Sequence, residues 1–166
     1  MENRQLAGLV RTLQVVGGAL IFGLASFALV TLLIVDWGKL NVELSQLGLI
    51  VLIASITSAV LAFILPGVIA KQAATQYASA NPKPELNSLL HASGQAVSVR
   101  SIIGFALAEG GAFMALLVWM ISGNVLGLIG AFLCLAVLIL KFPTTGKIEQ
   151  QMADFREEVK LQQRGR

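Results

Sequence analysis

The chain has 166 residues, of which 56% are hydrophobic and only 13% are charged. A soluble domain of this size carries about 25% charged residues, so the composition excludes a water-soluble globular protein and indicates an outer surface that faces lipid. The net charge of +3 does not indicate nucleic-acid binding, because the basic residues are spread over segments that adjoin apolar runs, where membrane topology requires them.

Four segments are long and apolar enough to be membrane spans, since a helix needs about 20 residues to cross ~30 Å of hydrocarbon. They cover residues 12–35, 44–70, 101–121 and 125–140. The first is about twice as long as the core of a signal peptide, so we expect a retained anchor. The last two are separated only by Ser122-Gly123-Asn124, which are turn residues. The fold predicted is all-α: an up-down bundle of four transmembrane helices over 1–146 and a cytoplasmic helical tail over 147–166.

The basic residues fix an orientation. One loop, 36–43, contains a single basic residue, Lys39, and the turn at 122–124 contains none. The other eleven lie before span one, between spans two and three, and after span four: Arg4, Arg11, Lys71, Lys83, Arg100, Lys141, Lys147, Arg156, Lys160, Arg164 and Arg166. The positive-inside rule places these eleven in the cytoplasm. We therefore expect a multi-pass protein of the inner (plasma) membrane with both ends cytoplasmic.

Aromatic residues and prolines refine this register. Trp37 and Trp119 fall near the outer ends of their helices, where an indole ring can remain in lipid with its N–H near the headgroups. The segment 71–80 has good helix formers and is predicted to extend span two, until Asn81-Pro82-Lys83-Pro84 stops it. Beyond it, Leu86, Leu89 and Leu90 have helical spacing, which predicts a short interfacial helix before span three. His91 lies there alone and is expected to be exposed or interfacial.

The tail has one apolar face. Ile148, Met152, Phe155 and Val159 recur at helical spacing, and most of the other positions are polar. Three interpretations remain open. The face packs on the chain's own cytoplasmic loop, lies on the membrane surface, or forms a short coiled coil with another subunit.

Glu109 is the residue that most needs an explanation. It lies eight positions beyond Ser101, which places it about 12 Å into span three. A charge there costs at least ~2.5 kcal/mol, so such residues face the bundle interior or a water-filled cavity. The residues around it are small, which favours a close helix–helix contact. Span two offers hydrogen-bond partners near mid-membrane in Ser55, Thr57 and Ser58, and Pro66 further along could leave a carbonyl free.

Other chemistry is not indicated. Cys134 is the single cysteine and lies inside an apolar run, so we expect a small buried or lipid-facing residue. We find no metal-ligand cluster, no phosphate loop, no haem pattern and no serine–histidine–acid set, and we expect neither catalysis nor a cofactor.

A local resemblance accompanies Glu109. The stretch Arg100–Trp119, RSIIGFALAEGGAFMALLVW, resembles the second helix of the rotary ATP synthase c subunit, in which a carboxylate lies near mid-membrane. The resemblance implies that Glu109 is an ion-binding carboxylate. Span two lacks the repeated glycines of that family's partner helix. As a whole the chain is more similar to a group of small, uncharacterised four-helix bacterial inner-membrane proteins, which share the Arg11-Thr12-Leu13-Gln14 start and the ALxEG element. That likeness implies the topology and no activity.

Two functions therefore compete. The first is a small non-enzymatic membrane protein that packs with itself or with a membrane partner, with Glu109 fixing helix register. The second is a proton- or cation-handling subunit, similar to the c subunit, in which Glu109 binds and releases the ion. Under both hypotheses the protein contacts the lipid bilayer, and nucleic acid is not expected as a partner.

Overall fold

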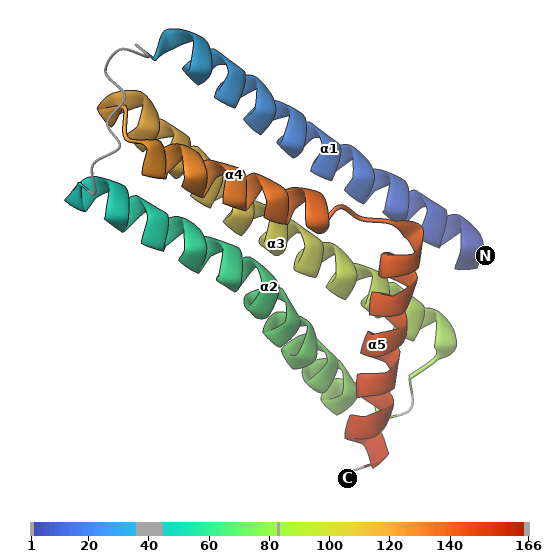
Figure 1. The fold of residues 1–166 in the computed structure, drawn as a ribbon. Coiled ribbons are helices and arrows are strands. Elements are labelled where there is room, and N and C mark those ends of the chain that lie inside the picture. The colour runs from blue at the N-terminus through green and yellow to red at the C-terminus, as the bar shows by residue number, and fades with distance from the viewer. Residues whose placement is uncertain (1, 36–44, 83, 165–166) are drawn as a thin grey trace. The chain divides into compact units, whose positions relative to one another are not determined.

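The computed structural model describes residues 2–35, 45–82 and 84–164, with side chains from Leu6 onward. Within these ranges the chain forms five helices and no strand (Figure 1). They are α1 (Glu2–Ile34), α2 (Gln46–Ala80), α3 (Leu86–Ser122), α4 (Val125–Leu140) and α5 (Thr145–Arg164). The predicted loop at 36–43, with Trp37 and Lys39, lies outside the described residues, as do Lys83 and Arg166.

Three of the described helices, α1 from Leu6, α2 and α3, are long and apolar enough to cross a membrane. A fourth candidate span results if α4 and α5, which follow each other across a short break, are taken together. The fold is thus all-α, and its long apolar helices are compatible with a multi-pass membrane protein.

The contacts divide the helices between two compact units. Unit 1 comprises residues 1–16, 64–103 and 143–166, and unit 2 comprises 17–63 and 104–142. The first three helices contribute to both units, whereas α4 belongs to unit 2 and α5 to unit 1.

Unit 2 is held together by small residues that let helices approach closely. A Cβ on Gly127 of α4 would lie 2.7 Å from the Ala115 carbonyl oxygen of α3. A Cβ on Gly130 would lie 2.5 Å from the Ser55 hydroxyl oxygen of α2, so α4 is in close contact with both helices. Such contacts are the usual means by which helices associate where no water drives them together. The buried core here also includes Leu24 of α1.

Two polar residues begin two of the helices in unit 2. The Ser45 hydroxyl accepts a hydrogen bond from the Gly48 N–H at 3.1 Å, and the Asn124 side-chain oxygen accepts one from the Leu126 N–H at 2.9 Å. Each is thus an N-cap, of α2 and of α4 respectively. The Asn124 amide also donates to the Ser45 hydroxyl at 2.8 Å. Gly123, at φ 64°, supplies the left-handed backbone angle that reverses the chain between α3 and α4.

Unit 1 is organised around α5, drawn in red in Figure 1 alongside the end of α2 and the start of α3. Ile148 and Met152 of α5 pack with α1 and α3, against a cluster that includes Val10, Leu13 and Val97. Phe155 and Val159 pack with α2 and α3, against a cluster formed by Ala74, Ala78 and Leu89. Of the three interpretations of the tail, this agrees with packing on the chain's own loop, since the apolar face is buried on residues of 74–97 and on α1. The cytoplasmic location of that loop stays a prediction.

Several local predictions are also confirmed. The extension of span two ends at Ala80, where the Asn81 backbone N–H bonds to the Tyr77 carbonyl before Pro82. The helix predicted over 125–140 coincides with α4, and His91 is exposed. The helix predicted within 85–99, leading into span three, is the first part of α3, which continues without a break because the segment up to Arg100 contains no helix-breaking proline.

The prediction for Trp119 was wrong. Its side chain is 0% exposed and belongs to the core of unit 2, so its ring does not face lipid in this structure. The reason is the turn at Gly123, which reverses the chain so that α4 runs back along α3. A Cβ on Gly127 would lie 3.0 Å from the Trp119 backbone nitrogen, so α4 passes close to this part of α3.

Candidate functional site

Glu109 lies on α3 within unit 2 and is half-buried. Phe113 follows it by four residues, so the two side chains share a face of the helix. Phe113 stacks on Phe27 of α1, with ring centroids 4.4 Å apart and planes inclined by 14°. Glu109 therefore lies on the flank of α3 that meets α1.

Open space adjoins this flank. A Cβ on Gly110, next to Glu109, would meet no atom within 4 Å, and the same holds for Gly23 of α1. Gly23 precedes Phe27 by four residues, as Glu109 precedes Phe113. Gly23 and Glu109 therefore each lie one helical turn from the stacked rings. Both glycines are exposed. Another helix could approach here more closely than it could against larger side chains.

The hydroxyls expected to bind Glu109 make other contacts. Ser55 is 1% exposed and donates to the Val51 carbonyl at 2.9 Å, while Thr57 is exposed and donates to the Ile53 carbonyl at 2.8 Å. Ser58 lies against Gly111, whose Cβ would be 2.7 Å from the Ser58 Cβ. Gly111 and Glu109 are about 200° apart around α3. Hydrogen bonds from these hydroxyls to Glu109 therefore stay a prediction.

The carboxyl of Glu109 takes part in none of the hydrogen bonds or ion pairs found among the described residues. Leaving a buried or lipid-facing polar group without a partner is costly. A carboxyl in this setting can form a hydrogen bond with a further helix or bind a cation that enters the open space.

Cys134 and Pro66 serve the packing of their helices. Cys134 is 0% exposed, and its thiol donates a weak hydrogen bond to the Ser55 carbonyl with Sγ and oxygen 3.4 Å apart. This agrees with the small, buried residue expected. Pro66 is buried, and α2 continues through it to Ala80.

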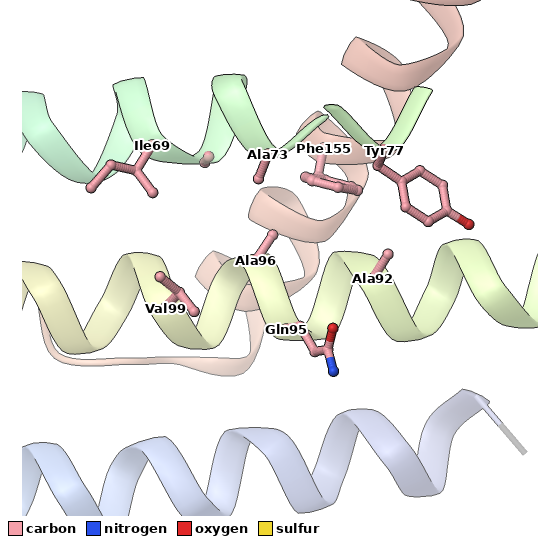
Figure 2. Close-up of a pocket in the computed structure, with 9 residues that line it drawn as sticks. Ile69, Ala73, Tyr77, Ala92, Gln95, Ala96, Val99 and Phe155 are labelled. Atoms are coloured by element: carbon pink, nitrogen blue, oxygen red, sulfur yellow. The ribbon is translucent and has the colours of Figure 1, made fainter. Parts of the chain in front are cut away.

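Unit 1 contains a groove that the sequence analysis did not predict. Figure 2 shows it between α2 and α3, with the ring of Phe155 from α5 between the two helices. Its volume is about 240 Å³. The lining residues are Ile69, Ala70, Ala73, Tyr77, Ala92, Gln95, Ala96, Val99 and Phe155. Four of them are alanines, whose small side chains leave the space between the helices unfilled.

A hydrogen bond joins the two helices at the Tyr77 end of the groove. The Tyr77 hydroxyl and the Ser88 hydroxyl are 2.9 Å apart and share a hydrogen bond that joins α2 to α3. The Tyr77 ring also contacts Phe155, with centroids 6.3 Å apart. The available sequence signal was the helical spacing of alanines at 70 and 73 and at 92 and 96, but spacing alone does not show which alanines face each other.

Neither region resembles a metal centre: no group of three or more histidine, cysteine or acidic side chains that could hold a metal ion occurs in the described part of the chain. Comparisons of the chain with protein-family models, with curated proteins and with solved structures found no match.

Proposed function

We propose that the chain is a membrane protein with four spans and both ends in the cytoplasm, which works without catalysis by packing against another membrane-embedded helix. The packing partner is a second copy or a different membrane protein. The observation that supports this most is the carboxyl of Glu109, which lies half-buried in a span, without a hydrogen-bond partner among the described residues, beside the open positions of Gly23 and Gly110.

The fourth span of this proposal is α4 alone. Its 16 residues carry no charge, and it packs within unit 2 against α2 and α3. Span two of this proposal runs along α2 from Gln46 to Ala70, and these 25 helical residues rise about 37 Å. With some tilt that length crosses the ~30 Å hydrocarbon core. The Lys141 ammonium lies 4.6 Å from the Phe63 ring centroid, which suits a lysine anchored at the cytoplasmic edge.

A second polar helix would relieve the cost of the isolated carboxyl. In a membrane, helices associate through small residues and through hydrogen bonds between polar side chains, the latter contributing about 1–2 kcal/mol in model peptides. Glu109 and the glycines beside it provide both. The inner membrane of a bacterium is the location that the sequence resemblance favours.

Cysteine cross-linking tests this proposal. In a Cys134→Ser background, Ala106→Cys places a thiol on the exposed side of α3, one turn before Gly110. The matched control is Ala136→Cys on α4, which is also exposed and lies five residues from the charged end of its span, as Ala106 lies five from Ser101. Oxidation in native membranes should cross-link the Ala106→Cys chain and not the control, and the mass of the product separates a homodimer from a complex with another protein. Equal cross-linking of the two variants, or none of either with a monomeric intact mass in mild detergent, would overturn the proposal.

A second candidate is the proton- or cation-handling subunit. The same carboxyl supports it, because a group without a partner among the described residues and next to open space can be reached by an ion. A ring of many identical copies would favour this candidate over a dimer or a fixed complex.

A further inference from the structure

The groove of unit 1 has the lining of an apolar ligand site. Phe155, which contributes its ring, is only 6% exposed, and the alanines at 73, 92 and 96 are half-buried. Among the nine lining residues, the polar side chains are Tyr77, whose hydroxyl bonds to Ser88, and Gln95 at the exposed edge. An apolar cavity of about 150 Å³ is enough to bind a benzene ring, so about 240 Å³ admits a length of hydrocarbon.

The position of the groove along the chain indicates which hydrocarbon is available to it. Its first walls are Ile69 with Ala70 and Val99, and the next residues in the chain are Lys71 and Arg100, the charges that border spans two and three. On the proposed topology these charges lie at the level of the lipid headgroups. One end of the groove thus begins where acyl chains end, and its other end, at Tyr77, lies further into the cytoplasm.

We propose that this groove binds a single acyl chain of a cytoplasmic-leaflet lipid, which leaves the bilayer and lies between α2 and α3 against Phe155. The inference rests on the membrane topology proposed above. Lys71 and Arg100 are placed to attract a lipid phosphate, but they also line a cleft of about 120 Å³ with Asp154 and Glu158 of α5. The two basic and two acidic side chains of this cleft therefore balance in charge. We expect the apolar walls of the groove to determine whether an acyl chain binds, and the lipid headgroup to add little selectivity.

A photoactivatable lipid provides the test. The full chain is reconstituted in vesicles of phosphatidylethanolamine and phosphatidylglycerol with a trace of phosphatidylethanolamine that carries a diazirine at the end of one acyl chain. In the bilayer that terminus reaches the middle of the membrane and labels residues of the spans. In the groove it labels residues 73–77 and 92–96, which on the proposed topology lie on the cytoplasmic side of Lys71 and Arg100 and away from the middle of the membrane. We expect labelling of both regions, and equal groove labelling by the corresponding phosphatidylglycerol probe.

Two variants make the result specific. Ala96→Leu and Ala73→Leu fill the groove and should abolish labelling at 73–77 and 92–96 while leaving the span labels unchanged. The matched control is Ala80→Leu on an exposed position of α2, which should keep both sets of labels. A free fatty acid with the same diazirine, added to the same vesicles, tests the source of the chain: groove labelling by the free acid and not by the phospholipid would overturn the proposal.

The outcomes separate the two proposals. Labels confined to the spans, or groove labels that persist in both leucine variants, would overturn the acyl-chain site and leave the membrane topology standing. An absence of labels in the spans would overturn the topology itself. Trypsin resistance of α5 in each variant shows that unit 1 is still folded when labelling is lost.

Discussion

The carbonyl oxygen of Ala115 lies 2.7 Å from the point where a Cβ on Gly127 would be placed. Atoms of a backbone carbonyl cannot rotate away as the end of a side chain can, so α3 and α4 are in contact at a distance that only glycine permits. The Trp119 nitrogen and Cβ, each 3.0 Å from the same point, close the site from one helical turn further along α3.

Gly127→Ala should therefore destabilise unit 2 by about 1–3 kcal/mol, the usual cost of overpacking a core. Cys134 gives a direct measurement, because this single cysteine is fully buried and reacts with a thiol-specific dye only as the helices separate. The midpoint of thermal unfolding in detergent should fall. Gly110→Ala, whose Cβ meets nothing within 4 Å, is the control and should leave the midpoint unchanged or raise it slightly. A similar midpoint for both variants would contradict the close contact.

Phe155→Ala should detach α5 from unit 1. Truncation of a buried phenylalanine typically costs about 3–5 kcal/mol, and Phe155 packs between α2 and α3. Trypsin cleavage after Arg156 and Lys160 should accelerate strongly in this variant. Leu161→Ala removes a side chain that is 54% exposed and should cleave at the wild-type rate. Cleavage that is equally slow in both variants would show that the face around Phe155 does not hold the tail.

Membrane orientation can be tested with single thiols in a Cys134→Ser background. Ile121→Cys lies at the end of α3 and Ala153→Cys on α5, and both positions are exposed. A membrane-impermeant maleimide added to intact cells should label Ile121→Cys at once and Ala153→Cys only after permeabilisation. The reverse pattern would invert the topology, and labelling of both without permeabilisation would rule out four spans.

Glu109→Gln and Glu109→Ala distinguish packing from ion exchange. Glutamine keeps the ability to form hydrogen bonds between helices, whereas alanine does not, so association through this face should survive in Gln and weaken by about 1–2 kcal/mol in Ala. Fluorescence energy transfer between labelled chains in vesicles measures it. If both variants associate as the wild type does, Glu109 has no part in the contact.

The ion-handling candidate makes a different prediction for the same residue. A hydrophobic carbodiimide reacts with a carboxyl within the membrane, so it should modify Glu109 in the wild type and should not modify the Glu109→Gln variant at that position. Sodium ions in the buffer should slow the reaction if the carboxyl binds that cation. No modification at any pH would count strongly against an exchanging site.

The sequence was sufficient for features that depend on position along the chain. The bounds of α4 follow from the charge at Lys141 and the turn residues before Val125, and the apolar face of α5 follows from its spacing. The sequence could not predict features that depend on which way a side chain points around its helix axis. Hydropathy predicts how deep in the membrane Trp119 lies but cannot show that α4 covers it. The close contact of α4 with α3 depends on residues such as Gly127, which do not stand out in an apolar run that contains other glycines.

The groove of unit 1 was missed for the same reason. Ala73 and Ala96 were evident as helix formers, but whether they face each other depends on how α2 and α3 are rotated about their axes. Phe155 of the tail also lines the groove. For Glu109, the sequence indicated the depth and the small neighbours, while the structure adds the flank shared with Phe113 and Phe27.

The bond between Asn124 and Ser45 has a mechanical consequence for the short helix α4. Each of these residues begins a helix, so tying them together makes α2 and α4 start level, and neither can slide along its axis without moving the other. On the proposed topology, the shortfall of a 16-residue helix against the bilayer thickness then falls at its far end. There the ammonium of Lys141 can reach outward over Phe63, so the thinness of the protein is accommodated at one leaflet only.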